Sequence, residues 1–297
     1  MTSAGRLPPW VKVPLPGRGD FYQVRKRLRE LQLNTVCEAA RCPNMAECWG
    51  CGTATFMILG DVCTRGCRFC DVTSGKPSPP DVEEPANLAA AVQAMKLRYV
   101  VITSVDRDDL PDQGSLHFVV VVQAIKATCP EVIVELLTPD FRDDATAIEA
   151  VGQSGAEVLG HNIETTRLLT RGVRDIRCSY DQSLRVLERF RALGSTHLVK
   201  SSLMLGLGEA PQDVLQTLGD LRSVGVDWVT LGQYLRPTRK HLEVARFVSP
   251  EEFDELAVEA RAMGFPLVTA GPLVRSSYRA AEKGAQQLLR QRAFSTR

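Results

Sequence analysis

The chain has 297 residues, of which 44% are hydrophobic, so it can bury a sizeable core as one large α/β domain or two ordinary ones. Its 36 basic and 35 acidic residues leave a formal net charge of +1 at pH 7. Affinity for a polyanion is built from clustered lysine and arginine, so this balance argues against a nucleic-acid partner or a broad membrane-binding face. A local basic patch is still compatible with it.

Cysteine usage is the most informative part of the composition. Seven of the nine cysteines fall between Cys37 and Cys70. The odd total, the missing charged-then-apolar leader and the lack of any run of about eighteen apolar residues indicate a reducing compartment and no membrane span. We therefore expect a cytoplasmic enzyme of bacterial type, whose clustered thiols bind metal rather than form disulfides.

The first expected element is an amphipathic helix at residues 21–31, ahead of the first cysteines. From Gly52 onward, apolar β-rich runs alternate with segments of helical period, which is typical of βα units around a parallel sheet. The expected strands lie at residues 54–60, 99–105, 132–137, 157–163, 197–205, 227–235 and 266–271.

Two of the helices between these strands have clear boundary signals. One, at residues 181–193, follows Ser179. The other, at residues 251–263, begins after the Ser249-Pro250 pair and ends before Gly264. The apolar run at residues 119–122 fits either a helix or a strand.

The spacing of the strands limits the architecture. At about 35 residues per βα unit, a closed barrel of eight units would need about 280 residues, more than the chain has left after its cysteine-rich leader. The sequence therefore predicts an α/β fold built on a partial (βα)6 TIM-like barrel at residues 52–272. An N-terminal extension at residues 1–51 and a C-terminal extension at residues 273–297 would flank this barrel.

The second cysteine group has the spacing of an iron–sulfur site. Cys63, Cys67 and Cys70 form a C-x3-C-x2-C loop directly after the first expected strand. Three thiolates can hold three corners of a [4Fe–4S] cluster, which normally takes four cysteines, so one iron would stay open. An open iron can chelate S-adenosylmethionine, and electron transfer into the sulfonium can cleave it to a 5′-deoxyadenosyl radical. A loop at the carboxyl end of a barrel strand is where such a scaffold places its chemistry.

The first group, Cys37, Cys42 and Cys48, again supplies three thiols, at C-x4-C-x5-C spacing. Its fourth ligand could be Cys51, or a serine or histidine from elsewhere in the chain. Zinc is the rival metal, because two C-x2-C pairs, ending at Cys51 and Cys70, match a zinc-ribbon template. A zinc site of this kind would leave three cysteines without a role and would place an apolar β-strand inside a small zinc knuckle. The sequence context therefore favours an iron–sulfur cluster.

Short blocks that run along nearly the whole chain point to one family. They read PPWVKV, NTVCEAARCPNMAECW, GTATFMILGDVCTRGCRFCDV, VITSVDRDDLPD, HNIET, GLGE, GQYLRPT and GPLVRSSY. The loop with Cys63 alone indicates only a radical S-adenosylmethionine enzyme. The paired cysteine groups and the terminal RSSY narrow this further, and the sequence closely resembles the lipoyl synthase family.

This resemblance implies two [4Fe–4S] clusters. One would bind and cleave S-adenosylmethionine, and the other, an auxiliary cluster, would donate sulfur to the substrate. Ser277 of the RSSY motif would be the fourth ligand of the auxiliary cluster, and serinate is a harder, more easily displaced ligand of iron than thiolate. The remaining ligands would be Cys63, Cys67 and Cys70 for the first cluster and Cys37, Cys42 and Cys48 for the auxiliary cluster.

The resemblance also implies the reaction and its partners. Two sulfur atoms would be inserted at C6 and C8 of a protein-bound octanoyl-lysine, at the expense of two S-adenosylmethionine molecules. Such unactivated C–H bonds are beyond any side-chain base, so the cofactor must carry that step. The substrates would be octanoylated glycine cleavage H protein and the lipoyl domains of 2-oxo-acid dehydrogenase acyltransferase subunits. Flavodoxin or ferredoxin would supply the electrons.

Other polar residues have weaker assignments. Ser104, Asn162 and Glu164 follow expected strands, where they could contact the cofactor or simply cap helices. The basic stretch at residues 236–246 could face an acidic carrier domain or be an ordinary solvated surface. We interpret the remaining isolated thiols and two histidines as structural: Cys51, Cys129, Cys178, His117 and His161.

Two alternative functions are weighed against lipoyl synthase. A sulfur-inserting radical enzyme of biotin-synthase type lacks support, because it does not explain the CEAARC block together with RSSY. The alternative from a different class is a non-catalytic zinc or iron–sulfur binding module.

Overall fold

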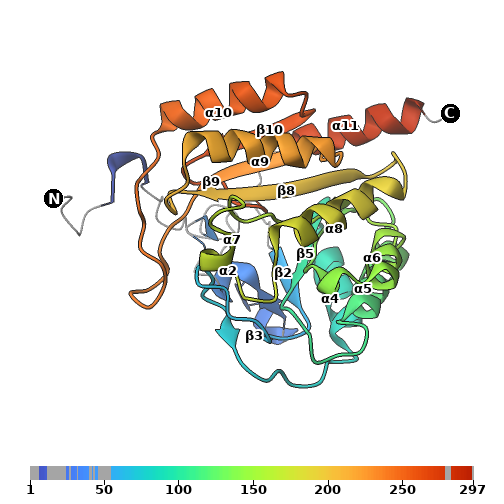
Figure 1. Cartoon of the computed structure of the whole chain (residues 1–297). Helices are drawn as coiled ribbons and strands as arrows, with labels where there is room; N and C mark the ends of the chain where they lie inside the picture. Colours follow the sequence, from blue (N-terminus) through green and yellow to red (C-terminus); the bar gives the residue numbers. More distant parts are fainter. Residues whose placement is uncertain are drawn as a thin grey trace.

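The computed structural model describes residues 7–11, 25–26, 28–31, 33–39, 42, 44–45, 55–277 and 282–295. These residues form an α/β fold around one large sheet of eight strands (Figure 1). Two short strands, β3 (Val62–Cys63) and β4 (Thr73–Ser74), form a separate parallel pair in the loop after β2.

The main sheet has the strand order β1-β2-β5-β6-β7-β8-β9-β10. Strand β1 (Asn34–Thr35) runs antiparallel to β2, and every other pairing is parallel. Each expected strand is confirmed, and within the described residues β10 pairs only with β9, so the barrel is partial as predicted. The parallel strands are β2 (Thr55–Ile58), β5 (Tyr99–Ser104), β6 (Ile133–Leu137), β7 (Val158–Gly160), β8 (Leu198–Leu205), β9 (Trp228–Gln233) and β10 (Leu267–Gly271).

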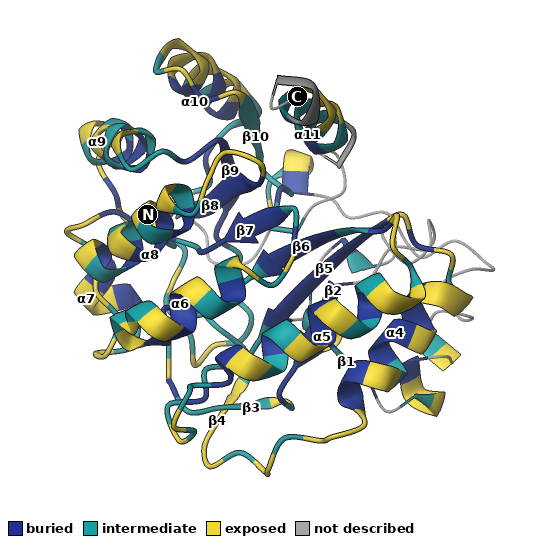
Figure 2. Ribbon diagram, turned by 90° about the vertical axis from the view of Figure 1, so that its right-hand side faces the viewer, coloured by how far each residue is buried: buried dark blue, intermediate teal, exposed yellow. Residues whose placement is uncertain are grey.

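Helices follow the strands in chain order and cover the outside of the sheet (Figure 2). The apolar run at residues 119–122 lies inside α5, which resolves its ambiguity in favour of a helix. The longer helices are α4 (Glu84–Ala94), α5 (Ser115–Thr128), α6 (Ala145–Gly152), α8 (Tyr180–Ala192), α9 (Pro211–Ser223), α10 (Pro250–Ala262) and α11 (Glu282–Ser295). The short ones are η1 (Pro9–Val11), α2 (Val36–Ala39), η2 (Phe141–Asp143) and α7 (Thr170–Val173).

The predicted helix boundaries hold to within a residue where serine caps them. The Ser179 side chain accepts a hydrogen bond from the backbone N–H of Gln182, which starts α8, and Ser249 forms a capping box with Glu252 at the start of α10. Of the helix predicted at residues 21–31, residues 25, 26 and 28–30 are helical, and residues 21–24 and 27 lie outside the described residues.

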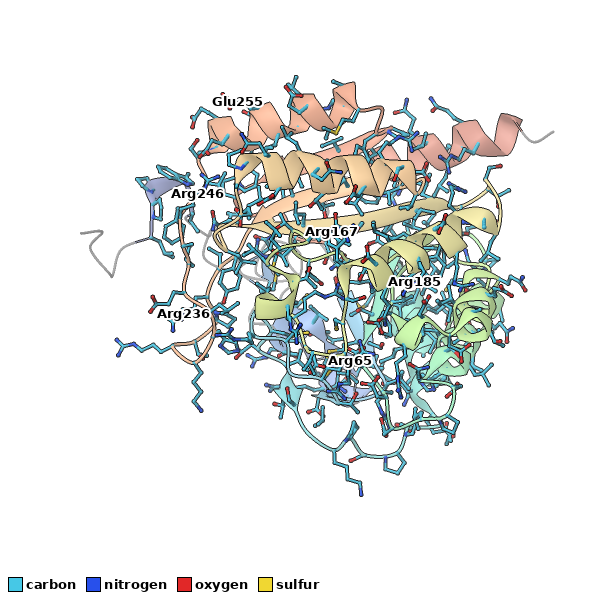
Figure 3. The ribbon with its side chains drawn as sticks, in the orientation of Figure 1. Arg65, Arg167, Arg185, Arg236, Arg246 and Glu255 are labelled. Carbon is cyan, nitrogen blue, oxygen red and sulfur yellow. The ribbon has the colours of Figure 1, made fainter. Side chains whose placement is uncertain are left out.

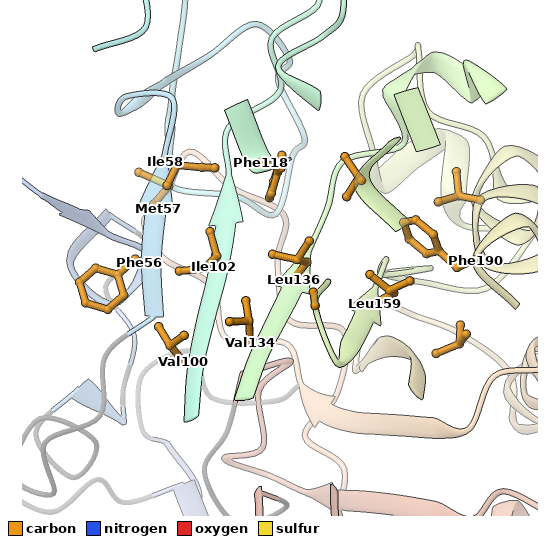
Figure 4. Packing of buried hydrophobic residues seen from close by; sticks show 14 of the residues in the cluster. Phe56, Met57, Ile58, Val100, Ile102, Phe118, Val134, Leu136, Leu159 and Phe190 are labelled. Atoms are coloured by element: carbon orange, nitrogen blue, oxygen red, sulfur yellow. The ribbon is translucent and has the colours of Figure 1, made fainter. Parts of the chain in front are cut away.

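The two faces of the sheet are packed differently because side chains alternate along each strand. Outward-facing side chains such as Val100, Ile102 and Leu136 join the large apolar core beneath the helices (Figure 4). Their neighbours in sequence face inward. At the amino end of the strands these inward side chains pack against Ala285, Leu288 and Leu289 of α11, which closes that end of the barrel.

A buried polar network lies one step further along the strands. Lys200 on β8 donates a hydrogen bond to Glu135 Oε1 on β6 at 2.7 Å, and both side chains are at most 4% exposed. The Tyr99 hydroxyl donates to the other Glu135 oxygen, and the Lys200 ammonium lies 3.5 Å from the Trp228 ring centroid. Two residues further along each strand the interior opens, so this network forms the floor of the space above it.

Removing the carboxylate should destabilise the fold, because it leaves the Lys200 charge buried without its ion-pair partner. We expect Glu135→Ala to lower the free energy of unfolding by about 3–5 kcal/mol. Urea unfolding followed by circular dichroism measures this, with Glu131→Ala, an exposed glutamate just before β6, as the matched control. Equal unfolding midpoints for the two variants would contradict a supporting role for the pair.

Within the described part of the chain, none of the helices has the length and apolar character needed to span a bilayer.

Candidate active site

The inside of the barrel opens, at the carboxyl ends of the parallel strands, into a cavity of about 480 Å³. Its wall includes residues from β2, β5, β6, β8 and β9 and from the loops that follow them. Cys48 lies outside the described residues. All other predicted site residues line this one cavity: Cys37, Cys42, Cys63, Cys67, Cys70, Ser104, Asn162, Glu164 and Ser277.

The C-x3-C-x2-C loop presents its sulfur atoms to backbone donors. The N–H groups of Arg65 and Asp106 point at Cys63 Sγ from 3.4 and 3.3 Å, and that of Asp175 points at Cys67 Sγ from 3.3 Å. Hydrogen bonds of this kind favour the thiolate, which is the form that binds iron. The loop is therefore shaped around negative charge on sulfur.

In the absence of metal, burial has the opposite effect on these thiols. It raises the pKa of Cys63 to about 12 and that of Cys70 to about 11, and it raises the pKa of Cys42 as well. The thiols are therefore protonated at neutral pH until a cation takes the place of their protons, so cluster binding must release protons.

The donor set fits a cubane cluster better than a single ion. Among the described residues, no three His, Cys, Asp or Glu side chains converge so as to hold one metal ion. A cubane does not need such convergence, since each thiolate binds a different iron. Six cysteines line this cavity, five of them from the two predicted ligand sets, and this number is compatible with iron–sulfur chemistry.

A buried arginine holds the cysteine loop against the strand ends. Arg65, which is 3% exposed, makes two hydrogen bonds to Asp108 at 2.8 and 2.9 Å and one to Asp140 at 2.7 Å (Figure 3). Its guanidinium is also 3.3 Å from Asp106, whose pKa burial raises to about 6. Sequence reasoning did not identify this cluster, although an arginine inside the loop and aspartates after two strands were visible signals.

The described residues of the first cysteine group and of the RSSY motif line the same cavity. The Asn44 side chain donates to the Leu273 carbonyl at 2.6 Å, which ties the CEAARCPN block to the segment before RSSY. Arg275 interacts electrostatically with Cys42, and burial lowers the pKa of Arg275. Ser277 lines the same cavity as Cys37 and Cys42, and Tyr278 lies outside the described residues.

A close backbone contact positions that segment. Gly232 on β9 lies against the Val274 carbonyl, and a Cβ at this glycine would come within 2.1 Å of the carbonyl oxygen. Only glycine allows the chain to cross the barrel mouth at this height.

The cavity also contains polar groups that could contact a ligand. Ser104 Oγ is buried and has no hydrogen-bond partner among the described residues, which suits a polar ligand. Asn162 donates to Glu164 Oε1 at 3.1 Å, and burial raises the pKa of Glu164. Glu164 also has a left-handed backbone (φ 67°), an uncommon conformation that turns the chain at the end of β7. These groups fit the polar end of a cofactor such as S-adenosylmethionine.

Two other residues of the site were interpreted differently or missed. Cys178, expected to be an isolated structural thiol, lines the cavity, accepts a hydrogen bond from Arg65 at 3.3 Å and is hydrogen-bonded to Cys67. That bond, with burial, raises the pKa of Cys67. His241 contacts the Cys70 carbonyl at 3.0 Å, a long-range contact with no local sequence signal.

The other residues interpreted as structural fit that interpretation where they are described. His161 is buried, with one ring nitrogen on the Thr138 carbonyl and the other on Ser183. His117 contacts Glu84, and Cys129 packs against the core. Cys51 lies outside the described residues.

Comparisons with known proteins identify the family of this chain. Residues 57–221 match the family model of the radical SAM superfamily, and residues 1–42 match that of the N-terminal domain of lipoyl synthase. The chain is 51% identical to the mitochondrial lipoyl synthase of Candida albicans (SC5314), over 97% of this chain and 76% of that protein. It is 54% identical to the lipoyl synthase of Ectopseudomonas mendocina, over 92% of this chain and 78% of that protein. The chain belongs to the lipoyl synthase family.

Family membership establishes the function. The chain is a radical S-adenosylmethionine sulfurtransferase that inserts sulfur into a protein-bound octanoyl group to give the lipoyl cofactor. The non-catalytic zinc or iron–sulfur module is therefore not retained as an alternative.

Solved structures support the fold at much lower identity. Methylornithine synthase superposes with a TM-score of 0.51 at 16% identity, covering 93% of this chain and 92% of that chain. The FeFe-hydrogenase maturase HydG of Carboxydothermus hydrogenoformans gives 0.54 at 12% identity, covering 92% and 78%. The partial TIM-like barrel is thus that of radical S-adenosylmethionine enzymes.

The names of the relatives do not support the expected cytoplasmic location. Relatives from Candida albicans, Lachancea thermotolerans and Sorghum bicolor are named mitochondrial, whereas that from Ectopseudomonas mendocina is not.

A side chain at position 232 should impair formation of the lipoyl product without preventing cleavage of S-adenosylmethionine. We expect Gly232→Ala to push the 273–277 segment away and to reduce lipoyl product roughly tenfold to a hundredfold, because small misplacements at a reacting centre are costly. S-adenosylmethionine cleavage should persist, since the Cys63 loop is held by other contacts. Product and 5′-deoxyadenosine are quantified by mass spectrometry, with Gly219→Ala in α9, where a Cβ meets nothing within 4 Å, as control. Normal product from Gly232→Ala would refute this role.

Proposed function

We propose that the cavity holds two [4Fe–4S] clusters facing a common substrate space. The supporting observation is that every described member of the two predicted ligand sets lines the same cavity. The ligands would be Cys63, Cys67 and Cys70 for the cluster that binds S-adenosylmethionine, and Cys37, Cys42, Cys48 and Ser277 for the auxiliary cluster.

When bound, the first cluster supplies the electron that cleaves S-adenosylmethionine, and the auxiliary cluster supplies sulfur. The chain's own residues bind and orient. Backbone donors favour thiolates at Cys63 and Cys67, and the Arg65 contacts keep their loop on the strand ends. The Arg275 cation beside Cys42 offsets part of the negative charge of the auxiliary thiolates.

The S-adenosylmethionine contacts are proposed at the ends of β5 and β7. Ser104 offers a hydroxyl that has no partner in the described protein, and Glu164 offers a carboxylate held by Asn162. A buried carboxylate is a suitable partner for the amino group of this cofactor, because low local dielectric strengthens the pairing.

The substrate carriers are proposed as the octanoylated H protein and the lipoyl domains of acyltransferase subunits, with flavodoxin or ferredoxin as electron donor. We retain the division into an extension at residues 1–51, a barrel at residues 52–272 and a C-terminal extension at residues 273–297. The cytoplasmic location also stays a prediction.

Substitutions at the two proposed cluster sites should block different steps of the reaction. We expect Ser277→Ala to keep cleavage of S-adenosylmethionine but to lose most lipoyl product, because only the auxiliary site loses a ligand. Cys67→Ala should abolish cleavage itself. The assay contains octanoylated H protein, dithionite and S-adenosylmethionine, and mass spectrometry detects 5′-deoxyadenosine and two added sulfurs. Unimpaired product from Ser277→Ala would make the serine assignment wrong.

Metal analysis tests the number of clusters independently of activity. The anaerobically purified protein should contain about eight irons with matching sulfide, as two cubanes require. Cys67→Ala and Cys42→Ala should each retain about four irons. Stoichiometric zinc without iron would contradict both cluster assignments.

A further inference from the structure

Three loops form one side of the cavity mouth and are bonded to each other through Arg68. The Arg68 N–H donates to the Val173 carbonyl at the end of α7, at 2.9 Å. The Arg68 carbonyl accepts from the N–H of Leu242, at 3.3 Å. The cysteine loop, the α7 region and the loop between β9 and α10 therefore present a single surface, which we call the mouth surface (residues 63–70, 170–177 and 236–246).

The β9–α10 loop connects this surface to the cavity. Arg236 and Pro237, at its start, line the cavity, and the loop then projects from the body of the molecule (Figures 1 and 3). The contact from His241 to the Cys70 carbonyl fixes its middle over the cysteine loop. A protein that contacts this loop lies within reach of the opening.

The mouth surface is basic although the chain as a whole is nearly neutral. Its segments contain nine arginines and lysines, of which Arg65 and Arg174 are buried, and two acidic residues, whereas the whole chain has a net charge of +1. Both acidic residues are already paired, Asp175 with Arg177 at 2.8 Å and Glu243 with Arg236 at 3.2 Å. Four exposed cations of this surface form no ion pair with a described carboxylate. They are Arg68, Arg171, Arg239 and Lys240.

Two large exposed apolar side chains lie close to Arg171 in the sequence. Leu168 and Ile176 are 76% and 82% exposed, and they flank α7 on either side in the sequence. The backbone of Asp175, next to Ile176, bonds to Cys67 Sγ, which fixes this segment at the mouth. Exposed apolar side chains surrounded by charge are typical of a protein-binding surface, where they provide area and the charges provide orientation.

From this arrangement we propose that the mouth surface is the docking site of the octanoylated carrier domain, and that it binds an acidic face of that domain around the modified lysine. The inference rests on the proposed use of a carrier-bound substrate. The acyl-lysine arm has to enter the cavity, so the carrier must cover the opening, and the described loops there present unpaired positive charge. Net attraction between opposite charges speeds encounter and sets orientation.

Charge reversal combined with two substrates tests the docking site. The double variant Arg239→Glu/Lys240→Glu removes two cations from the tip of the β9–α10 loop. We expect the carrier concentration that gives half-maximal turnover to rise about tenfold or more at low salt. The rate with a short octanoyl-lysine peptide should not change, because a peptide needs only the cavity. Added Arg171→Glu should increase the effect on the carrier further.

A direct binding measurement complements the kinetics. The carrier is the H protein or lipoyl domain, whichever the unaltered enzyme processes faster, labelled with a fluorophore and left unacylated. Its affinity for the unaltered enzyme should fall with ionic strength, and that dependence should weaken in the double variant. Lys96→Glu/Arg98→Glu, a reversal of two exposed cations at the amino end of β5, is the matched control.

The outcomes separate the docking site from the proposed function. Unchanged carrier affinity and turnover in the double variant would overturn the docking site while lipoyl synthesis is retained. An equal loss with carrier and peptide would also overturn it, because the loop would then act on the cavity. Absence of sulfur insertion with either substrate in the unaltered enzyme would instead contradict the proposed function.

Discussion

The Arg65 guanidinium, buried among Asp106, Asp108 and Asp140, is the interaction on which the site depends. Asp106 and Asp108 follow strand β5, and Asp140 follows strand β6. One arginine side chain therefore fixes the cysteine loop to two neighbouring strands. Arginine suits this position because its planar fork can bond several carboxylate oxygens at once and keeps its charge when buried. The cysteine loop is thereby tied to the strand ends by side-chain contacts of the protein itself.

The same region contains titratable groups whose ionisation would change on cluster binding. Burial raises the pKa values of the Cys63 and Cys70 thiols and of the Asp106 carboxyl, so each of these groups keeps its proton to a higher pH than it would in water. Backbone N–H groups around the sulfurs favour the opposite, deprotonated state. Burial and the backbone N–H groups act on these ligands in opposite directions. Binding of a multiply charged metal centre, rather than contact with solvent, would therefore determine their ionisation.

Below the cavity, the interior of the barrel is first polar and then, nearer the amino end, apolar. At the amino end, α11 fills the interior with apolar side chains, and above it the Lys200–Glu135 pair forms a polar floor. Above this floor, where the inward positions become Thr103, Ser202 and Gly232, lies the cavity. Small residues near the carboxyl ends of the strands and large ones at the amino end place the opening of the described barrel at its carboxyl end. The loops, Cys37, Cys42 and residues 274–277 lie at that end, whereas α11 closes the amino end.

The sequence by itself determined the strands, because alternating apolar runs separated by helical segments leave few other ways to bury that surface. It also predicted an iron-binding loop, because the spacing of Cys63, Cys67 and Cys70 is local. The tertiary structure alone decided that Cys178 lies beside Cys67, that Arg65 reaches three aspartates and that Gly232 admits the Val274 carbonyl. These contacts join residues far apart in the chain, such as Asn44 and Leu273, which are 229 positions apart. No local pattern encodes such a pairing, since it results from how the strands order themselves in the sheet and where their carboxyl ends meet.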